Sequence, residues 1–215
     1  SCILNRIPDD RRIKKKWSAR PEQGYVEYIT SIEDIPLDSG DWLILARTNY
    51  RLKNLVPQLK ERGLYFEIKN RKSYRTRLYR SIQDYTRWTN GAKLSLSECR
   101  DLFEFLELDK ELKDERMYDL KEFGYSFTDD LYIREMIRNE EKLSQDPRIK
   151  LSTIHAAKGG EATNVLIILD NTKKIREAIE KNQDKYDEEQ RVWYVGVTRT
   201  KQNLYIMAAK KEDKG

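Results

Sequence analysis

The apolar run Val-Leu-Ile-Ile-Leu at residues 165–169 is the feature that most narrows the folds open to this chain. It is continuous and does not alternate with polar residues, so it favours a buried strand covered on both faces. A second continuous run, Trp-Leu-Ile-Leu-Ala at residues 42–46, follows a turn at residues 38–41. Strands covered on both faces are typical of parallel sheets with flanking helices. We therefore predict an α/β protein with a mostly parallel sheet.

The segments around these runs extend the alternation of strands and helices. Leu52, Leu55, Val56 and Leu59 recur at helical spacing, and Gly63 stands where that helix would end. A strand at residues 65–68 would follow. The patterns predict further strands at residues 25–30, 149–153 and 204–208, and further helices at residues 173–186 and 187–195.

Between residues 74 and 146 the strand patterns disappear and helical patterns replace them. We expect helices at residues 81–89, 96–108 and 130–143, and Ser95 with Glu98 has the spacing of a capping box. The predicted organisation is one discontinuous domain of residues 1–73 and 147–215, interrupted by a helical insertion at 74–146. Residues 1–20 are a candidate linker from a preceding domain.

The charged residues permit a polyanionic partner without demonstrating one. The chain has 42 Lys and Arg against 37 Asp and Glu, a net charge of +5, and the basic residues concentrate at residues 11–16 and 69–80. Acidic residues dominate residues 104–115 and 184–189. This uneven distribution modestly favours a nucleic acid as the binding partner. The alternative is that these charged segments are ordinary solvated faces.

Cysteine and histidine are too few for a disulfide framework or a zinc site. Only Cys2, Cys99 and a single histidine, His155, occur. No apolar run approaches the roughly 18 residues of a membrane span, and no signal-peptide core is present. We expect a reducing, cytoplasmic location, no metal ligands in this chain and a monomeric fragment.

Three segments carry residues suited to chemistry. In Leu-Ile-Leu-Ala-Arg-Thr-Asn, residues 43–49, Arg47 leaves the carboxyl end of a buried strand, where ligands of open α/β sheets bind. In the segment of residues 151–161 a strand runs into a loop of small residues that lets a backbone approach a ligand closely. In the segment of residues 188–200, Arg199 follows a helical pattern and could act on a phosphate. Taken singly, each arginine is better explained as a solvated surface residue.

Two apparent nucleotide motifs are excluded, and a third residue is weighed against an ordinary structural role. Lys158-Gly159-Gly160 has the reverse order of a phosphate-binding loop, which needs Gly-x-x-x-x-Gly-Lys-Ser/Thr. Asp170 stands where a Walker B aspartate would follow a strand, but without that loop a strand-terminating turn is the favoured role. A lone histidine such as His155 is more often structural than catalytic.

Together and in this order, the three segments resemble motifs IV, V and VI of the UvrD, Rep and PcrA type of superfamily 1 helicases. The matching residues read Ala-Arg-Thr-Asn, Thr-Ile-His-Ala-Ala-Lys-Gly-Gly-Glu and Tyr-Val-Gly-Val-Thr-Arg. The resemblance extends over residues 20–90 and 147–209. It implies a RecA-like three-layer sandwich of the P-loop NTPase type, namely the second motor domain, with the insertion as a small counterpart of an accessory domain.

The resemblance also implies roles for particular residues. Arg47 and Arg199 would contact the γ-phosphate of ATP, Glu161 would hold the ribose, and Gly159 would lie against the nucleotide. We accordingly expect the parallel sheet to bring the two guanidinium groups to one edge. Thr153 and His155 match positions that contact single-stranded DNA. The basic segment that could continue this DNA track contains Arg71, Lys72, Tyr74 and Arg75.

The resemblance implies an ATP-dependent 3′-to-5′ DNA helicase whose Mg²⁺ is held mainly by a separate N-terminal domain with the phosphate-binding loop. The fragment alone would then be inactive. Ala46 departs from the family, which usually has a tyrosine there that packs on adenine, and Gly160 replaces a usual leucine. Two alternatives stay open: a non-catalytic nucleic-acid-binding protein with a degenerate helicase fold, and the helicase part of a helicase-nuclease of the AddA or RecB kind.

Overall fold

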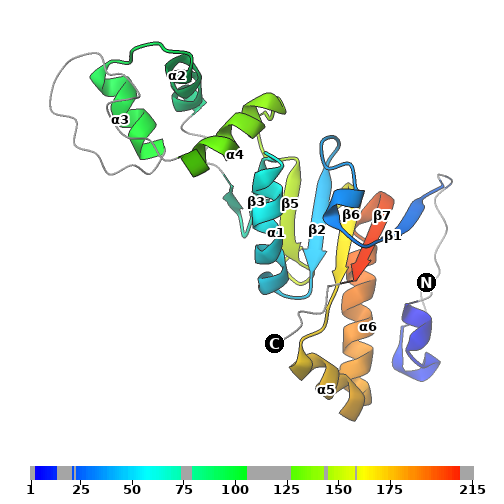
Figure 1. Cartoon of the computed structure of the whole chain (residues 1–215). Coiled ribbons are helices and arrows are strands. Elements are labelled where there is room, and N and C mark those ends of the chain that lie inside the picture. Colours follow the sequence, from blue (N-terminus) through cyan, green and yellow to red (C-terminus); the bar gives the residue numbers. More distant parts are fainter. Residues whose placement is uncertain are drawn as a thin grey trace. The chain divides into compact units, whose positions relative to one another are not determined.

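The computed structural model describes residues 3–13, 21, 23–73, 79–105, 127–142, 145–157 and 159–208. The chain forms two compact units (Figure 1). The first contains Ser1–Val56 and Arg148–Gly215, and the second contains Pro57–Pro147. Within the described residues no helix is both long enough and apolar enough to cross a bilayer.

The first unit contains a parallel sheet. Its strands are β1 (Tyr25–Ile29), β2 (Trp42–Ala46), β5 (Ile149–Thr153), β6 (Ala162–Leu169) and β7 (Thr200–Ala208), in the order β1-β7-β6-β2-β5. The pairs β1–β7, β7–β6, β6–β2 and β2–β5 are all parallel. All five residues of β2 are buried, as expected for a strand between two neighbours and under helices. The predicted α/β fold with a mostly parallel sheet is confirmed.

Helices and short 3₁₀ turns complete this unit. The helices are α1 (Asn49–Glu61), which continues into the second unit, α5 (Lys173–Lys181) and α6 (Gln183–Val197), and the 3₁₀ turns are η1 (Leu4–Arg6), η2 (Asp9–Arg11) and η3 (Ile32–Asp34). Helix α6 lies against β6 and β7 (Figure 1). Its Val192, Trp193 and Val195 pack on a core that includes Leu45 and Ile167.

The boundary between the last two helices differs from the prediction. We expected one helix to reach residue 186 and the next to begin at residue 187, whereas α5 ends at Lys181 and α6 begins at Gln183. Asn182 makes the break because its backbone is extended and its side chain accepts hydrogen bonds from the backbone N–H groups of Asp184 and Lys185. An asparagine in this conformation is a good N-cap, which apolar spacing alone does not reveal.

The second unit combines a small hairpin with helices. The antiparallel strands β3 (Phe66–Ile68) and β4 (Arg71–Lys72) are joined by Lys69 and Asn70, both with positive φ. The two-residue turn with two positive φ values is the type that suits the twist of a hairpin. The strand expected at residues 65–68 is present as β3, whereas its partner β4 was not predicted, because β4 is short and basic rather than apolar.

The helices of this unit are α2 (Tyr79–Thr89), α3 (Leu96–Phe105) and α4 (Phe127–Arg138). Trp88 of α2 and Phe103 of α3 pack with ring centroids 6.0 Å apart. The predicted capping box is confirmed: the Ser95 N–H donates to Glu98 at 2.7 Å, and the Glu98 N–H donates to Ser95 Oγ at 3.4 Å.

Candidate functional site

The parallel sheet distributes the candidate residues over two opposite edges. Arg47 directly follows β2, and Thr153 ends β5 beside Ala46, so both lie at the carboxyl edge. Glu161 directly precedes β6, and Arg199 directly precedes β7, so both lie at the amino edge. Ala46 is level with Ile168 of β6, whereas Thr200 is level with Ala162 of the same strand. The two edges are therefore about 20 Å apart along the strands.

The prediction that the sheet brings Arg47 and Arg199 to one edge is wrong. Arg47 leaves a strand at its carboxyl end, whereas Arg199 lies between the end of α6 and the start of the next strand. In a parallel sheet a helix runs back from the carboxyl edge to the amino edge before the following strand begins. Residues at a strand end and at a helix end therefore lie on different sides.

At the carboxyl edge Arg47 is held by a buried carboxylate. Its Nε lies 3.1 Å from both carboxylate oxygens of Glu189, whose side chain is only 5% exposed. With its amide nitrogen towards Glu189, Asn171 donates a further hydrogen bond of 3.0 Å. A buried carboxylate is tolerable only when paired and hydrogen-bonded, so Glu189 anchors the base of the Arg47 guanidinium.

His155 completes the group at this edge. The Nδ1 of His155 lies 3.4 Å from a terminal nitrogen of Arg47, and the imidazole is exposed. The turn that carries it is fixed on either side, since Ile154 and Ala157 are buried in the core. The Thr153 hydroxyl accepts a hydrogen bond of 3.3 Å from the Ala156 N–H. The Arg47 guanidinium and the His155 imidazole therefore lie together at this edge, where they could bind an anion.

At the amino edge the two predicted nucleotide residues are brought together. The N–H of Ala162, next to Glu161, donates to the carbonyl oxygen of Arg199 at 3.1 Å. Arg199 is half-buried and its Nε donates to the Val195 carbonyl at 3.2 Å. Glu161 and Gly159 are both exposed. The φ of Gly159 is +85°, which suits glycine, and a Cβ added there would meet no heavy atom within 4 Å.

The basic segment of the second unit is described only in part. Arg71 is exposed, and the Lys72 ammonium pairs with Asp146 at 2.8 Å. Tyr74 and Arg75 lie outside the described residues.

Two contacts at the carboxyl edge are not predictable from the sequence pattern. Glu189 was seen only as part of an acidic helix, and its contact with Arg47 joins residues 142 positions apart. Asp170 directly follows the last residue of β6, as expected for a residue that ends a strand. Its side chain also pairs with Arg51 at 2.5 Å. No local pattern signals either pairing.

Comparison with known protein families identifies the chain. The model of the UvrD-like helicase C-terminal domain matches residues 77–211, more than half of the chain, and we conclude that the chain belongs to this family. The matched range includes Thr153, His155, Glu161 and Arg199 but not Arg47. The comparison with curated proteins gives no match.

Proposed function

We propose that this chain is the C-terminal motor domain of an ATP-dependent DNA helicase or translocase that moves 3′-to-5′. In this proposal the chain acts with an N-terminal domain that carries the phosphate-binding loop and holds most of the Mg²⁺ coordination. The observation that carries the proposal is that Glu161 and Arg199 lie side by side at the amino edge, where the backbone of Ala162, next to Glu161, is hydrogen-bonded to that of Arg199. These two positions match the family's ribose and γ-phosphate residues, and both lie within the matched range.

The amino edge is the proposed nucleotide-facing side. Among the described residues, the Arg199 guanidinium makes one hydrogen bond, which its Nε donates to the Val195 carbonyl. Its two terminal nitrogens can therefore bind a phosphate. The Glu161 carboxylate is exposed and able to accept hydrogen bonds from ribose hydroxyls. These residues fit ATP bound mainly by another domain. The bound Mg²⁺–ATP would supply the phosphoryl group whose transfer to water drives the motor, and Arg199 would stabilise the charge that develops on it.

The carboxyl edge is the proposed DNA-facing side. Thr153 and His155 match the family's positions that contact single-stranded DNA. The 3.4 Å contact between His155 and Arg47 supports a new role for Arg47, which would bind a DNA phosphate instead of the nucleotide. Helix α6 connects the two sides: Glu189, which holds Arg47, and Arg199 are ten positions apart, about 15 Å along a helix. Closure of the motor domains around nucleotide would thereby shift the DNA contacts.

The test is DNA-stimulated ATP hydrolysis by the chain joined to its phosphate-binding domain. Arg199→Ala should lower kcat by roughly three powers of ten, because an arginine finger acts mainly on the transition state. Arg176→Ala, which removes an exposed arginine of α5, is the matched control and should leave kcat unchanged. Unchanged hydrolysis in Arg199→Ala would contradict the proposal and favour a non-catalytic nucleic-acid-binding role.

A further inference from the structure

A short N-terminal segment is fastened to the helix that links the two edges. This N-terminal strap, residues 3–13, contains η1 and η2, and η1 packs against α6. Ile7 of the strap is only 1% exposed. Arg12 braces the strap internally by pairing with Asp9 and donating to Asn5 at 2.6 Å. Residues 1–20 are a candidate linker by sequence, yet residues 3–13 of them are folded onto the domain.

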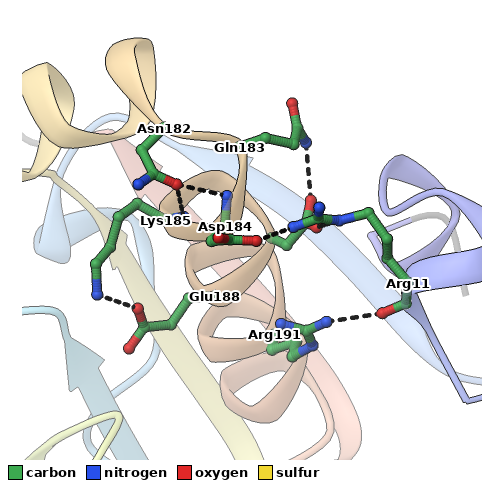
Figure 2. Close-up of polar contacts among 8 residues, drawn as sticks. Arg11, Asn182, Gln183, Asp184, Lys185, Glu188 and Arg191 are labelled. Atoms are coloured by element: carbon green, nitrogen blue, oxygen red, sulfur yellow. Dashed lines mark hydrogen bonds and ion pairs between the residues drawn. The ribbon is translucent and has the colours of Figure 1, made fainter.

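Arg11 makes the main polar attachment (Figure 2). Its Nε donates to Asp187 at 2.5 Å, and a terminal nitrogen pairs with Asp184. The attachment is reciprocal, because Arg191 donates at 2.9 Å to the backbone carbonyl of Arg11. Asp184, Asp187 and Arg191 are three and four positions apart, so they lie on one face of α6.

Asp187 makes this attachment more than a surface ion pair. Its side chain is 0% exposed, whereas that of Asp184 is 78% exposed. Burial by itself raises the pKa of Asp187, but hydrogen bonds from Gln183 and Arg11 outweigh it, and the net pKa is lowered. A fully buried, ionised carboxylate strongly disfavours any arrangement in which its partners leave. The strap and the first turns of α6 are therefore bound as one piece.

We propose that the N-terminal strap clamps α6 and thereby positions two functional residues: Glu189, which holds Arg47 from the middle of the helix, and Arg199, which follows the end of the helix. Arg11 and Asp187 are then positioning residues that touch neither nucleotide nor DNA. Resting on the proposed function, the strap would also transmit motion, because it would connect the N-terminal motor domain to the helix that leads to Arg199. A displacement of the preceding segment would move α6 at its beginning and shift Arg199 at its end.

The first test is amide hydrogen exchange on this chain, which needs neither nucleotide nor DNA. Arg11→Ala should speed exchange roughly tenfold or more in α6 as well as in the strap, because charge-assisted hydrogen bonds to a buried group are lost. Arg12→Ala is the matched control, since it breaks contacts inside the strap, and it should leave α6 unchanged. Arg11→Lys, which keeps the charge, should restore part of the protection. Faster exchange in the strap with unchanged exchange in α6 would overturn the clamp.

The second test is kinetic and uses the chain joined to its phosphate-binding domain. Arg11→Ala should lower kcat about tenfold while the KM for ATP changes less than about twofold, because the displaced group acts in the transition state. A loss of protection in α6 with unchanged kcat would overturn the positioning role. The two proposals fail separately: if Arg199→Ala hydrolyses ATP normally, the proposed function is wrong, while the exchange experiment still decides whether the clamp exists.

Discussion

Single residues in this chain set where helices end and how closely segments approach. Gly63 shows both effects: the N–H of Gly63 donates to Lys60 O at 2.9 Å, and the N–H of Leu64 donates to Leu59 O at 3.0 Å. This hydrogen-bond pair is the Schellman ending of a helix, and it places Gly63 at a φ of +62°. The predicted helix stop at Gly63 is thereby confirmed.

Gly63→Ala should be unusually costly. A Cβ at this position would lie 2.3 Å from the Cβ of Glu135 and 2.4 Å from its carbonyl carbon, so a close contact adds to the unfavourable φ. We expect the free energy of unfolding of the second unit to fall by about 3 kcal/mol. Urea denaturation, with amide exchange of α4 to localise the effect, measures it.

Gly91 offers a matched control for this substitution. It has the same role after α2 and a φ of +87°, but a Cβ there would meet no heavy atom within 4 Å. Gly91→Ala should therefore cost only about 1 kcal/mol, from backbone strain alone. Equal losses in the two variants would contradict the role given to Glu135.

At the scale of elements, helix α3 begins through a charged cap. Glu98 accepts hydrogen bonds from the backbone and the hydroxyl of Ser95 and pairs with Arg87. The backbone hydrogen bond from Ser95 and the Arg87 guanidinium lower the pKa of Glu98 to about 2. The cap therefore works with an ionised glutamate.

Ser95→Ala should lower the free energy of unfolding by about 1 kcal/mol, since the Glu98 N–H in the first turn of α3 loses its partner. Arg100→Ala, at an exposed position further along α3, is the control and should have little effect. Chemical denaturation at neutral pH gives both values, and an equal loss at both positions would argue against a cap.

The same cap predicts a pH dependence. Because the pKa of Glu98 is lower in the folded chain, its contribution is complete above the ordinary glutamate pKa of about 4.3 and is lost as the pH falls through about 2. The stability difference between the wild type and Glu98→Gln should be largest near neutral pH and shrink below about pH 4. A difference that grows on acidification would contradict this assignment.

At the scale of the whole molecule, a net charge of +5 is too small to explain DNA binding unless basic groups gather where a strand passes. The carboxyl edge is such a place in our proposal. Single-stranded DNA should bind with an affinity that falls as salt rises, by about 0.7 in the slope of log K against log salt for each phosphate contacted.

Removing Arg47 should therefore reduce that slope by about 0.7. The suitable variant is Arg47→Ala combined with Glu189→Ala, because taking away both partners avoids leaving a buried carboxylate unpaired. Fluorescence anisotropy with a labelled oligonucleotide at several salt concentrations measures the slope. Arg176→Ala is again the control. An unchanged slope in the double variant would show that Arg47 does not contact a DNA phosphate.

The sequence by itself determined the α/β class, the strands of the parallel sheet, the Gly63 helix stop, the Ser95 cap and the helicase motifs. These features depend on neighbouring residues, whose spacing is visible in one dimension. Once the sheet is parallel, the order of strands and helices along the chain already places Arg47 and Arg199 at opposite edges. Only the tertiary structure decided that Glu189 holds Arg47 and that Arg11 is paired with α6. Those outcomes depend on distances between segments more than about a hundred residues apart, which are set by strand register and packing and leave no trace in local patterns.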